Sequence, residues 1–307
     1  MRFIGFDTSN YTTSAALFAD AEMHSARRLL PVKAGEAGLR QSDAVFHHTA
    51  ALPELFDTLP DMTHAAAVGV SDRPRDAEGS YMPCFLTGVA AASCTAKALG
   101  APLYRFSHQA GHIAAALWSA GRTDLMDKTF LAFHVSGGTT ECVRVTPDPD
   151  RVLRAELLLS SLDLKAGQAV DRVGVMLGCP FPAGKYVDAE AHKSSREFSI
   201  RVPVRDGCCS LSGLQNQCER MFRSGESPAD VCRYCLLYIC RALEAMADYA
   251  VKEHSGLPLV FSGGVTSNTL LRAALSARYE SVFASPEYAC DNAAGIAYLS
   301  YYKHEMI

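Results

Sequence analysis

Apolar and polar positions near the N-terminus follow a pattern that predicts a β-hairpin. The stretch RFIGFDTSNYTTSAALFAD places two apolar segments on either side of a turn made of small polar residues. The stretch FLAFHVSGGTTECVRVTPD repeats this pattern later in the chain. We interpret the two hairpins as an internal duplication, whose period is far too long for a solenoid repeat.

Strand-like and helix-like segments alternate around the two hairpins, which predicts an α/β fold with sheets covered by helices. The pattern favours two lobes divided near residue 125 (1–125 and 126–307), with the C-terminal helix packing back on the first lobe. A cleft between two lobes is the usual place for a ligand. Helices are expected at 42–59, 83–100, 108–117, 166–178, 227–254, 269–279 and from about 292, and further strands at 64–71, 101–107, 154–161 and 258–264.

Composition adds that the chain is an ordinary globular protein. It has 307 residues, of which 49% are hydrophobic and 20% charged, enough for two packed lobes. Neither a signal-peptide pattern nor a run of 18 apolar residues occurs, so we expect a cytoplasmic protein without a membrane partner. The eleven cysteines lie in core-like segments, and we expect them to be reduced and mostly buried.

Charge gives no general attraction to nucleic acid, because the net charge is -4. Any RNA contact therefore needs a local basic patch, and the best candidate is residues 184–207. The acids of this segment nearly cancel its bases, so a solvated surface of mixed charge is an equally good interpretation.

Three glycine-containing turns follow apolar strands and are candidates for binding phosphate. Glycine lets the backbone approach a phosphate closely, and a following helix N-terminus offers free N–H groups. Two SGG turns in a two-lobed protein favour a nucleotide site, although neither is a Walker loop. The glycines of these turns are Gly137 and Gly138, Gly167, and Gly263 and Gly264.

Two polar residues near these turns have two interpretations each. Asp171 lies one helical turn after Gly167 and either contacts ribose hydroxyls or is a surface acid stabilised by the helix dipole. Asn268 ends the second SGG turn and either caps the next helix, the commoner role, or contacts the nucleotide.

His108 and His112 in SHQAGHIAAAL are candidate metal ligands. Residues four apart lie on one face of a helix, so the two imidazoles can share an ion. The alternative is that both are ordinary side chains on a helix surface, and a metal site needs a third donor. Asp291 begins the last predicted helix and is either that third ligand, facing the cleft, or an N-cap.

The motifs GFDTS, HQAGH, SGGTTE, AGQAVDRV, SGGVTSN and CDNAAGIAY occur in an order that resembles the tRNA threonylcarbamoyladenosine transferase family, formerly called glycoproteases. The resemblance spans essentially the whole chain. It implies a two-lobed actin-like, sugar-kinase-like ATPase fold and a carbamoyl-type transfer from an acyl-adenylate. The implied acceptor is the tRNA adenosine next to the anticodon, and a homodimer or a heterodimer with a partner of the same fold is expected by analogy.

The resemblance also assigns site residues. It implies a divalent metal, iron or zinc, held by His108, His112 and Asp291 close to the phosphates of ATP, AMP or the acyl-adenylate. It implies phosphate contacts from the two glycine pairs. The residues that it places at the ribose and base are Gly167, Asp171, Gly184 and Asn268.

Peptidase activity is not expected, because zinc peptidases of the H-E-x-x-H type need a glutamate where this chain has Gln109. The chain also departs from the family. Asn10, Tyr11 and Thr12 replace a cysteine and an Asp-Glu pair, the loop 71–83 replaces a Gly-Pro loop, and Thr139 replaces a histidine. These departures concern the acceptor side and leave two further hypotheses open: a diverged transferase with another acceptor, and a non-catalytic nucleotide-binding partner subunit. No catalytic residue is assigned from the sequence.

Overall fold

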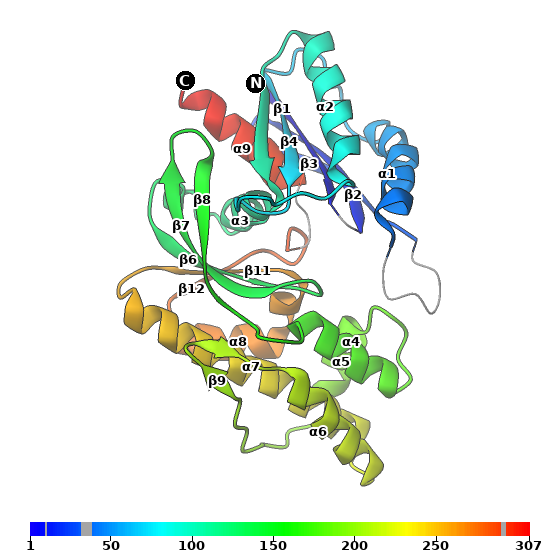
Figure 1. Cartoon of the computed structure of the whole chain (residues 1–307), viewed down its shortest axis with the longest axis vertical. Helices are drawn as coiled ribbons and strands as arrows, with labels where there is room; N and C mark the ends of the chain where they lie inside the picture. Colours follow the sequence, from blue (N-terminus) through cyan, green and yellow to red (C-terminus); the bar gives the residue numbers. More distant parts are fainter. Residues whose placement is uncertain (10, 32–38, 290–292) are drawn as a thin grey trace. The chain divides into compact units, whose positions relative to one another are not determined.

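Two sheets with the same strand order organise the protein (Figure 1). The computed structural model describes residues 1–9, 11–31, 39–289 and 293–307. It divides into two units, and the first consists of Met1–Lys128, Thr146–Ala155 and Cys290–Ile307. The second consists of Thr129–Val145 and Glu156–Ala289. No helix within the described ranges is long and apolar enough to cross a membrane.

The strand order supports the duplication inferred from the two hairpins. The first sheet has the order β3-β2-β1-β4-β5, and the second has the equivalent order β8-β7-β6-β11-β12. In both, the hairpin strands are antiparallel and the last two strands run parallel to the first. The strands are β1 (Arg2–Ser9), β2 (Thr12–Ala19), β3 (Glu22–Leu29), β4 (Ala67–Arg73), β5 (Leu103–Ser107), β6 (Phe130–Val135), β7 (Thr140–Asp148), β8 (Val152–Ser160), β11 (Leu259–Ser262) and β12 (Ser281–Phe283).

Helices cover both faces of the first sheet. Thr8 faces α2, where its hydroxyl accepts a hydrogen bond from the Gly88 N–H at 3.0 Å. Gly5 faces α9, and a Cβ at Gly5 would lie only 2.3 Å from the Ala293 carbonyl oxygen. The backbone of α9 therefore lies directly on β1 (Figure 1). The helices of this unit are α1 (Gln41–Phe56), α2 (Phe85–Leu99), α3 (His108–Ser119), α9 (Ala293–Glu305) and the 3₁₀ helix η1 (Thr123–Leu125).

Buried helix α7 dominates the second unit. Ser227 caps its N-terminus by accepting a hydrogen bond from the Asp230 N–H at 3.1 Å, and Pro228 occupies the first turn. Its apolar face packs into the core together with the sheet residues Phe133 and Phe261. The remaining elements are α4 (Ala166–Met176), α5 (Gly184–Ala191), α6 (Ser212–Arg223), α8 (Thr269–Arg278), η2 (Gly264–Ser267), β9 (Val204–Arg205) and β10 (Cys208–Cys209).

The expected helices and strands are present, but several elements carry no clear sequence signal. Strand β3 is an edge strand whose exposed side chains are largely charged, so it lacks an apolar face. Helices α5 and α6 have polar sequences, and α5 lies within the segment that the sequence presents only as a mixed-charge stretch. These elements are held by tertiary packing rather than by a strong local pattern.

The cysteines are reduced thiols throughout the described residues, and most of them are buried. Burial raises the pKa of Cys209 and of Cys232 to about 12. A buried thiol with a raised pKa is a poor nucleophile and a poor metal ligand at neutral pH, as expected for core residues.

Candidate functional site

Asp7 and His108 form a buried pair at the end of β1. The Nδ1 atom of His108 lies 2.9 Å from Oδ2 of Asp7, whose side chain has no exposed surface. The other carboxylate oxygen accepts a hydrogen bond from the Ser9 N–H at 2.9 Å. Burial alone raises the pKa of Asp7, but the attraction to His108 and these hydrogen bonds outweigh it and hold the pKa below its ordinary value.

The start of α3 is fixed by its neighbours, and this fixes the position of His108. Ser107 caps the helix by accepting a hydrogen bond from the Ala110 N–H at 3.2 Å. The Ser107 hydroxyl also donates to Asp76 at 3.1 Å, and Arg73 donates to the same carboxylate at 2.9 Å. Asp76 belongs to the loop 71–83, in which the sequence departs from the family. That loop therefore holds the N-terminus of the histidine helix.

His108 and His112 lie side by side on α3, as their spacing predicts. Their ring centroids are 4.6 Å apart and the rings are nearly perpendicular. His112 is 9% exposed and His108 only partly exposed, so neither is an ordinary surface side chain. Asp291 lies outside the described residues. Within the described ranges, no group of three or more His, Cys, Asp and Glu side chains is arranged to hold a metal.

The two imidazoles are nevertheless a suitable donor pair for iron or zinc. Because Nδ1 of His108 already bonds to Asp7, Nε2 is the ring nitrogen that remains for a metal. A carboxylate bonded to the far nitrogen of a ligating histidine is a common arrangement around metal sites. Asp7 is thus a functional candidate that the sequence analysis missed, since nothing in the spacing of GFDTS and HQAGH shows that they meet.

A third imidazole, His48 on α1, is buried close to this pair. Its Nδ1 atom lies 2.8 Å from the Thr13 hydroxyl on β2. Burial lowers the pKa of His48 to about 4, although the charge of Asp7 opposes this shift. At neutral pH His48 is therefore uncharged beside the Asp7 carboxylate.

The predicted glycine turns come together in the second unit. A Cβ at Gly167 would lie 2.6 Å from the Gly137 nitrogen, and one at Gly263 would lie 2.3 Å from the Val135 carbonyl oxygen. Gly263 also has a φ of 96°, which favours glycine. The β6–β7 turn, the start of α4 and the start of η2 therefore form one cluster of closely packed backbone, which we call the glycine cradle: residues 136–138, 166–167 and 263–264.

The glycine cradle also has open space on one side, at Gly137 and Gly138. Apart from its neighbours along the chain, no described residue has an atom within 4 Å of a Cβ built on Gly137 or Gly138, so the outer side of the β6–β7 turn is open toward them. The Thr140 hydroxyl accepts a hydrogen bond from the Ala166 N–H at 2.9 Å and ties the start of α4 to this turn. An open turn beside a helix N-terminus is suited to an anionic group.

The polar residues predicted near the cradle have structural partners. Asn268 caps α8 by accepting a hydrogen bond from the Leu271 N–H at 3.1 Å, and its amide donates to Asp188 at 2.7 Å. Asp171 accepts a hydrogen bond from the Ala183 N–H at 2.8 Å, while burial raises its pKa. A Cβ built on Gly184, at the start of α5, would have no atom within 4 Å among the described residues other than its chain neighbours and its own helix. Asn268 is thus a capping residue, whatever else it contacts.

Three of the five Lys and Arg side chains of the charged segment 184–207 lie close to acids. Lys193, two residues beyond the end of α5, pairs with Glu190 of that helix at 2.5 Å, and Arg196 pairs with Glu226. Arg205 lies 3.7 Å from Asp206. This arrangement favours the mixed-charge surface over a basic RNA-binding patch.

Solved structures of other proteins share this fold at low sequence identity. T. kodakarensis HypF superimposes with a TM-score of 0.64 at 13% identity, covering 99% of this chain and 48% of that one. The activator of the 2-hydroxyisocaproyl-CoA dehydratase from Clostridium difficile gives a TM-score of 0.58 at 13% identity, covering 99% and 96%. At such identities the likeness shows the fold alone, the α/β fold of the actin-like and sugar-kinase-like ATPases.

Sequence comparison is more specific. The family model "tRNA N6-adenosine threonylcarbamoyltransferase" matches residues 62–298. Enzymes of that name from Rhodospirillum rubrum and Streptococcus pneumoniae (strain Hungary19A-6) are 29% and 32% identical to this chain. The first alignment covers 97% of this chain and 88% of the relative, the second 81% and 73%. With its histidine helix and its glycine cradle, the chain belongs to the tRNA N6-adenosine threonylcarbamoyltransferase family.

Proposed function

We propose that this protein is a metal-dependent transferase that moves a threonylcarbamoyl or carbamoyl-like group from an acyl-adenylate to an acceptor. The best single candidate for the acceptor is the tRNA adenosine next to the anticodon. The observation that carries the proposal is the paired His108 and His112, with Asp7 on the far nitrogen of His108, in a chain of this family.

The proposed transfer balances as follows. The amino group of the acceptor attacks the carbonyl carbon of the acyl-adenylate, and the bond between that carbon and the phosphate oxygen breaks. AMP leaves with the bonding electron pair, and the attacking nitrogen loses a proton. A metal bound by His108, His112 and Asp291 would polarise the carbonyl or neutralise the leaving phosphate.

The cradle glycines Gly137, Gly138, Gly167, Gly263 and Gly264 are proposed to bind the phosphate of the adenylate through the backbone. Asp171, Gly184 and Asn268 are proposed to lie at its ribose and base. The open space at the β6–β7 turn supports the first assignment. Asn268 is held in place by its cap on α8 and by its hydrogen bond to Asp188.

A second candidate function is a diverged transferase that uses another acceptor. It is favoured by Tyr11 and Thr12, which stand where the family has an Asp-Glu pair. Thr12 is the first residue of β2, and its neighbour Tyr11 is at the surface. Neither side chain can supply a carboxylate to an acceptor. A non-catalytic partner subunit is the third alternative, and the retained histidine pair argues against it.

The test is a direct assay by mass spectrometry. The metal-loaded protein is incubated with threonylcarbamoyl-adenylate and unmodified tRNA, and both AMP and the modified nucleoside are measured. We expect both products, and we expect H108A and H112A to abolish them. A family enzyme run in parallel serves as positive control. AMP formed faster than in a blank without protein, but without modified tRNA, would show transfer to water in place of tRNA and would favour another acceptor. Neither product would favour the partner-subunit alternative.

A further inference from the structure

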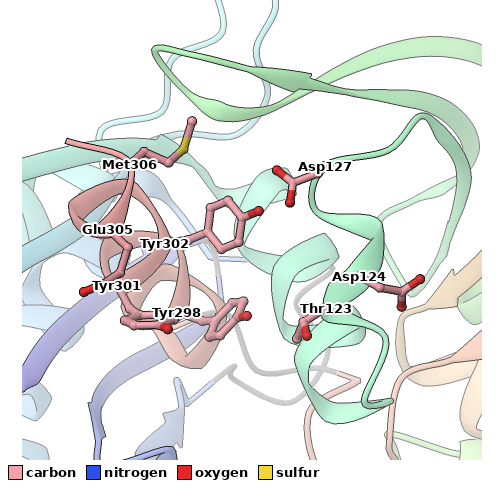
Figure 2. A pocket seen from close by; sticks show the side chains of 8 residues that line it. All are labelled: Thr123, Asp124, Asp127, Tyr298, Tyr301, Tyr302, Glu305 and Met306. Atoms are coloured by element: carbon pink, nitrogen blue, oxygen red, sulfur yellow. The ribbon is translucent and has the colours of Figure 1, made fainter.

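A cavity of about 490 Å³ lies in the first unit, among residues to which neither the metal pair nor the cradle belongs. Helix α9 contributes one wall, and the segment around η1 contributes the other (Figure 2). Its volume is in the range of small-molecule sites in proteins. The lining residues are Thr123, Asp124, Asp127, Tyr298, Tyr301, Tyr302, Glu305 and Met306.

The cavity presents the rings of three tyrosines. Tyr298, Tyr301 and Tyr302 lie on one face of α9 by their spacing. Figure 2 shows the Tyr302 hydroxyl directed toward Asp127 and the Tyr298 hydroxyl toward Thr123. Tyr298 and Tyr301 also pack against Phe18, with centroids 5.5 and 5.1 Å away. The tyrosine rings therefore give the cavity an apolar wall whose position is fixed by packing against Phe18.

All the charged side chains that line the cavity are acidic. Asp124 is compensated by Arg122 and Lys128, at 2.8 and 3.0 Å. Asp127 and Glu305 form no ion pair with any described residue, and in Figure 2 they lie on opposite sides of the Tyr302 ring. Two uncompensated carboxylates therefore flank an aromatic surface.

Two basic residues of α9, Lys303 and His304, are not among the side chains that line the cavity. The Lys303 ammonium donates to the Pro149 carbonyl oxygen, and the His304 ring lies against Tyr104 and Phe3. The cavity thus presents carboxylates as its charged groups, which disfavours phosphates and carboxylates as ligands. It attracts cations, and tyrosine rings add a favourable interaction with an ammonium group.

We propose that this cavity binds an aliphatic diamine or polyamine. The methylene chain would cover the Tyr302 ring, and the two ammonium groups would pair with Asp127 and Glu305. A bare metal ion fits less well, because the described residues form no group of three metal-ligating side chains here. The site is independent of the proposed transfer reaction.

The test uses isothermal titration calorimetry on the full chain at low salt. Putrescine is the probe, with butylamine and 1,4-butanediol as singly charged and neutral analogues of the same length. We expect a Kd of about 1 mM or tighter for putrescine, at least tenfold weaker binding of butylamine and no binding of the diol. Equal binding of all three, or no binding of putrescine at 10 mM as a rough upper limit of the assay, overturns the proposal.

Variants locate the site. D127N/E305Q should weaken putrescine binding at least tenfold, as should Y302L, while Y302F keeps the ring and should retain most of the binding. E280Q removes an exposed carboxylate of the second unit and is the matched control. NMR spectra of each variant check the fold. Binding that D127N/E305Q leaves unchanged, or that Mg²⁺ displaces at equal concentration, would show attraction to general negative charge and refute the site.

Discussion

At the scale of single residues, the most informative contact is the one between Asp7 and His108. The sequence predicts the pairing of His108 with His112, because four residues make about one helical turn. It does not predict the approach of Asp7, which depends on how β1 and α3 pack. The carboxylate accepts a hydrogen bond from Nδ1 and thereby favours the imidazole form with its proton on Nδ1 and a free Nε2.

A first prediction concerns this imidazole form. D7A should return His108 to a mixture of forms, whereas D7N keeps an acceptor and should largely preserve the wild-type form. Nitrogen-15 NMR shifts of the histidine rings, recorded without metal at a pH where the imidazoles are neutral, report it directly. We also expect D7A to weaken zinc binding by about 10- to 100-fold. An unchanged His108 spectrum in D7A would contradict the positioning role.

A second prediction concerns His48. Its pKa is about 4 in the folded protein and about 6.5 when unfolded, so between these values the unfolded state binds more protons. The contribution of uncharged His48 to the free energy of unfolding is fully present above pH 6.5. It is lost as the pH falls from 6.5 to about 4, at a rate of at most about 1.4 kcal/mol per pH unit. Denaturant unfolding of wild type and H48Q from pH 7.5 to 4.5 measures it. Parallel pH curves for the two proteins would refute it.

At the scale of elements, close backbone packing decides what the sequence can reveal. Glycine turns after apolar strands are visible in the sequence, and the cradle is built from them. That Gly167 lies against Gly137 is not visible, because it depends on the placement of α4 against the β6–β7 turn. The polar helices α5 and α6 and the edge strand β3 were missed, since packing and pairing stabilise them more than any local pattern.

A third prediction tests the cradle. In G167A the added methyl group would lie 2.6 Å from backbone, so the β6–β7 turn must shift. We expect a loss of about 2 kcal/mol in the free energy of unfolding and at least tenfold weaker binding of ATP or AMP. The control is G213A on α6, where a Cβ has space and alanine favours the helix. Equal nucleotide affinity in wild type and G167A would argue against a nucleotide at the cradle.

A fourth prediction tests the packing of α3 on α9. A Cβ at Gly295 would lie 1.8 Å from the Gly111 carbonyl oxygen, in the turn of α3 between the two histidines. G295A should therefore destabilise the first unit by about 2 kcal/mol or more and weaken metal binding by displacing α3. Thermal melts and zinc titration measure the two effects. A destabilised variant with unchanged zinc affinity would show that α9 does not help to position the histidines.

At the scale of the whole molecule, the repeated hairpin pattern and the order of the motifs determine how much of the fold and of the function can be predicted from the sequence. The two hairpins predicted a repeated α/β unit, and the two sheets share one strand order. The family assignment was equally accessible, because it rests on motifs in order along the chain. The acceptor could not be predicted in the same way, because Tyr11 and Thr12 stand where the family has an Asp-Glu pair and carry no carboxylate.

A fifth prediction concerns tRNA. With a net charge of -4 and acids beside three of the five Lys and Arg side chains of 184–207, the chain alone should bind tRNA weakly. We expect affinity to fall by less than about tenfold between roughly 50 and 200 mM salt, far less than for a protein with many phosphate contacts. Fluorescence anisotropy with labelled tRNA measures this. K185E/R201E/R205E should bind like wild type, and a steep loss in that variant would reveal a basic interface.

The assignment of α9 has a consequence for how the chain can be divided. This helix follows the fifth strand of the second sheet, just as α3 follows the fifth strand of the first, yet it packs on β1 and α3. The last helix of the later copy thus packs with the earlier copy of the duplicated unit. A cut of the chain after Lys128 would therefore separate the first sheet from α9, one of the helices that pack on it. Fragments 1–128 and 129–307 should therefore become well folded only when they are mixed.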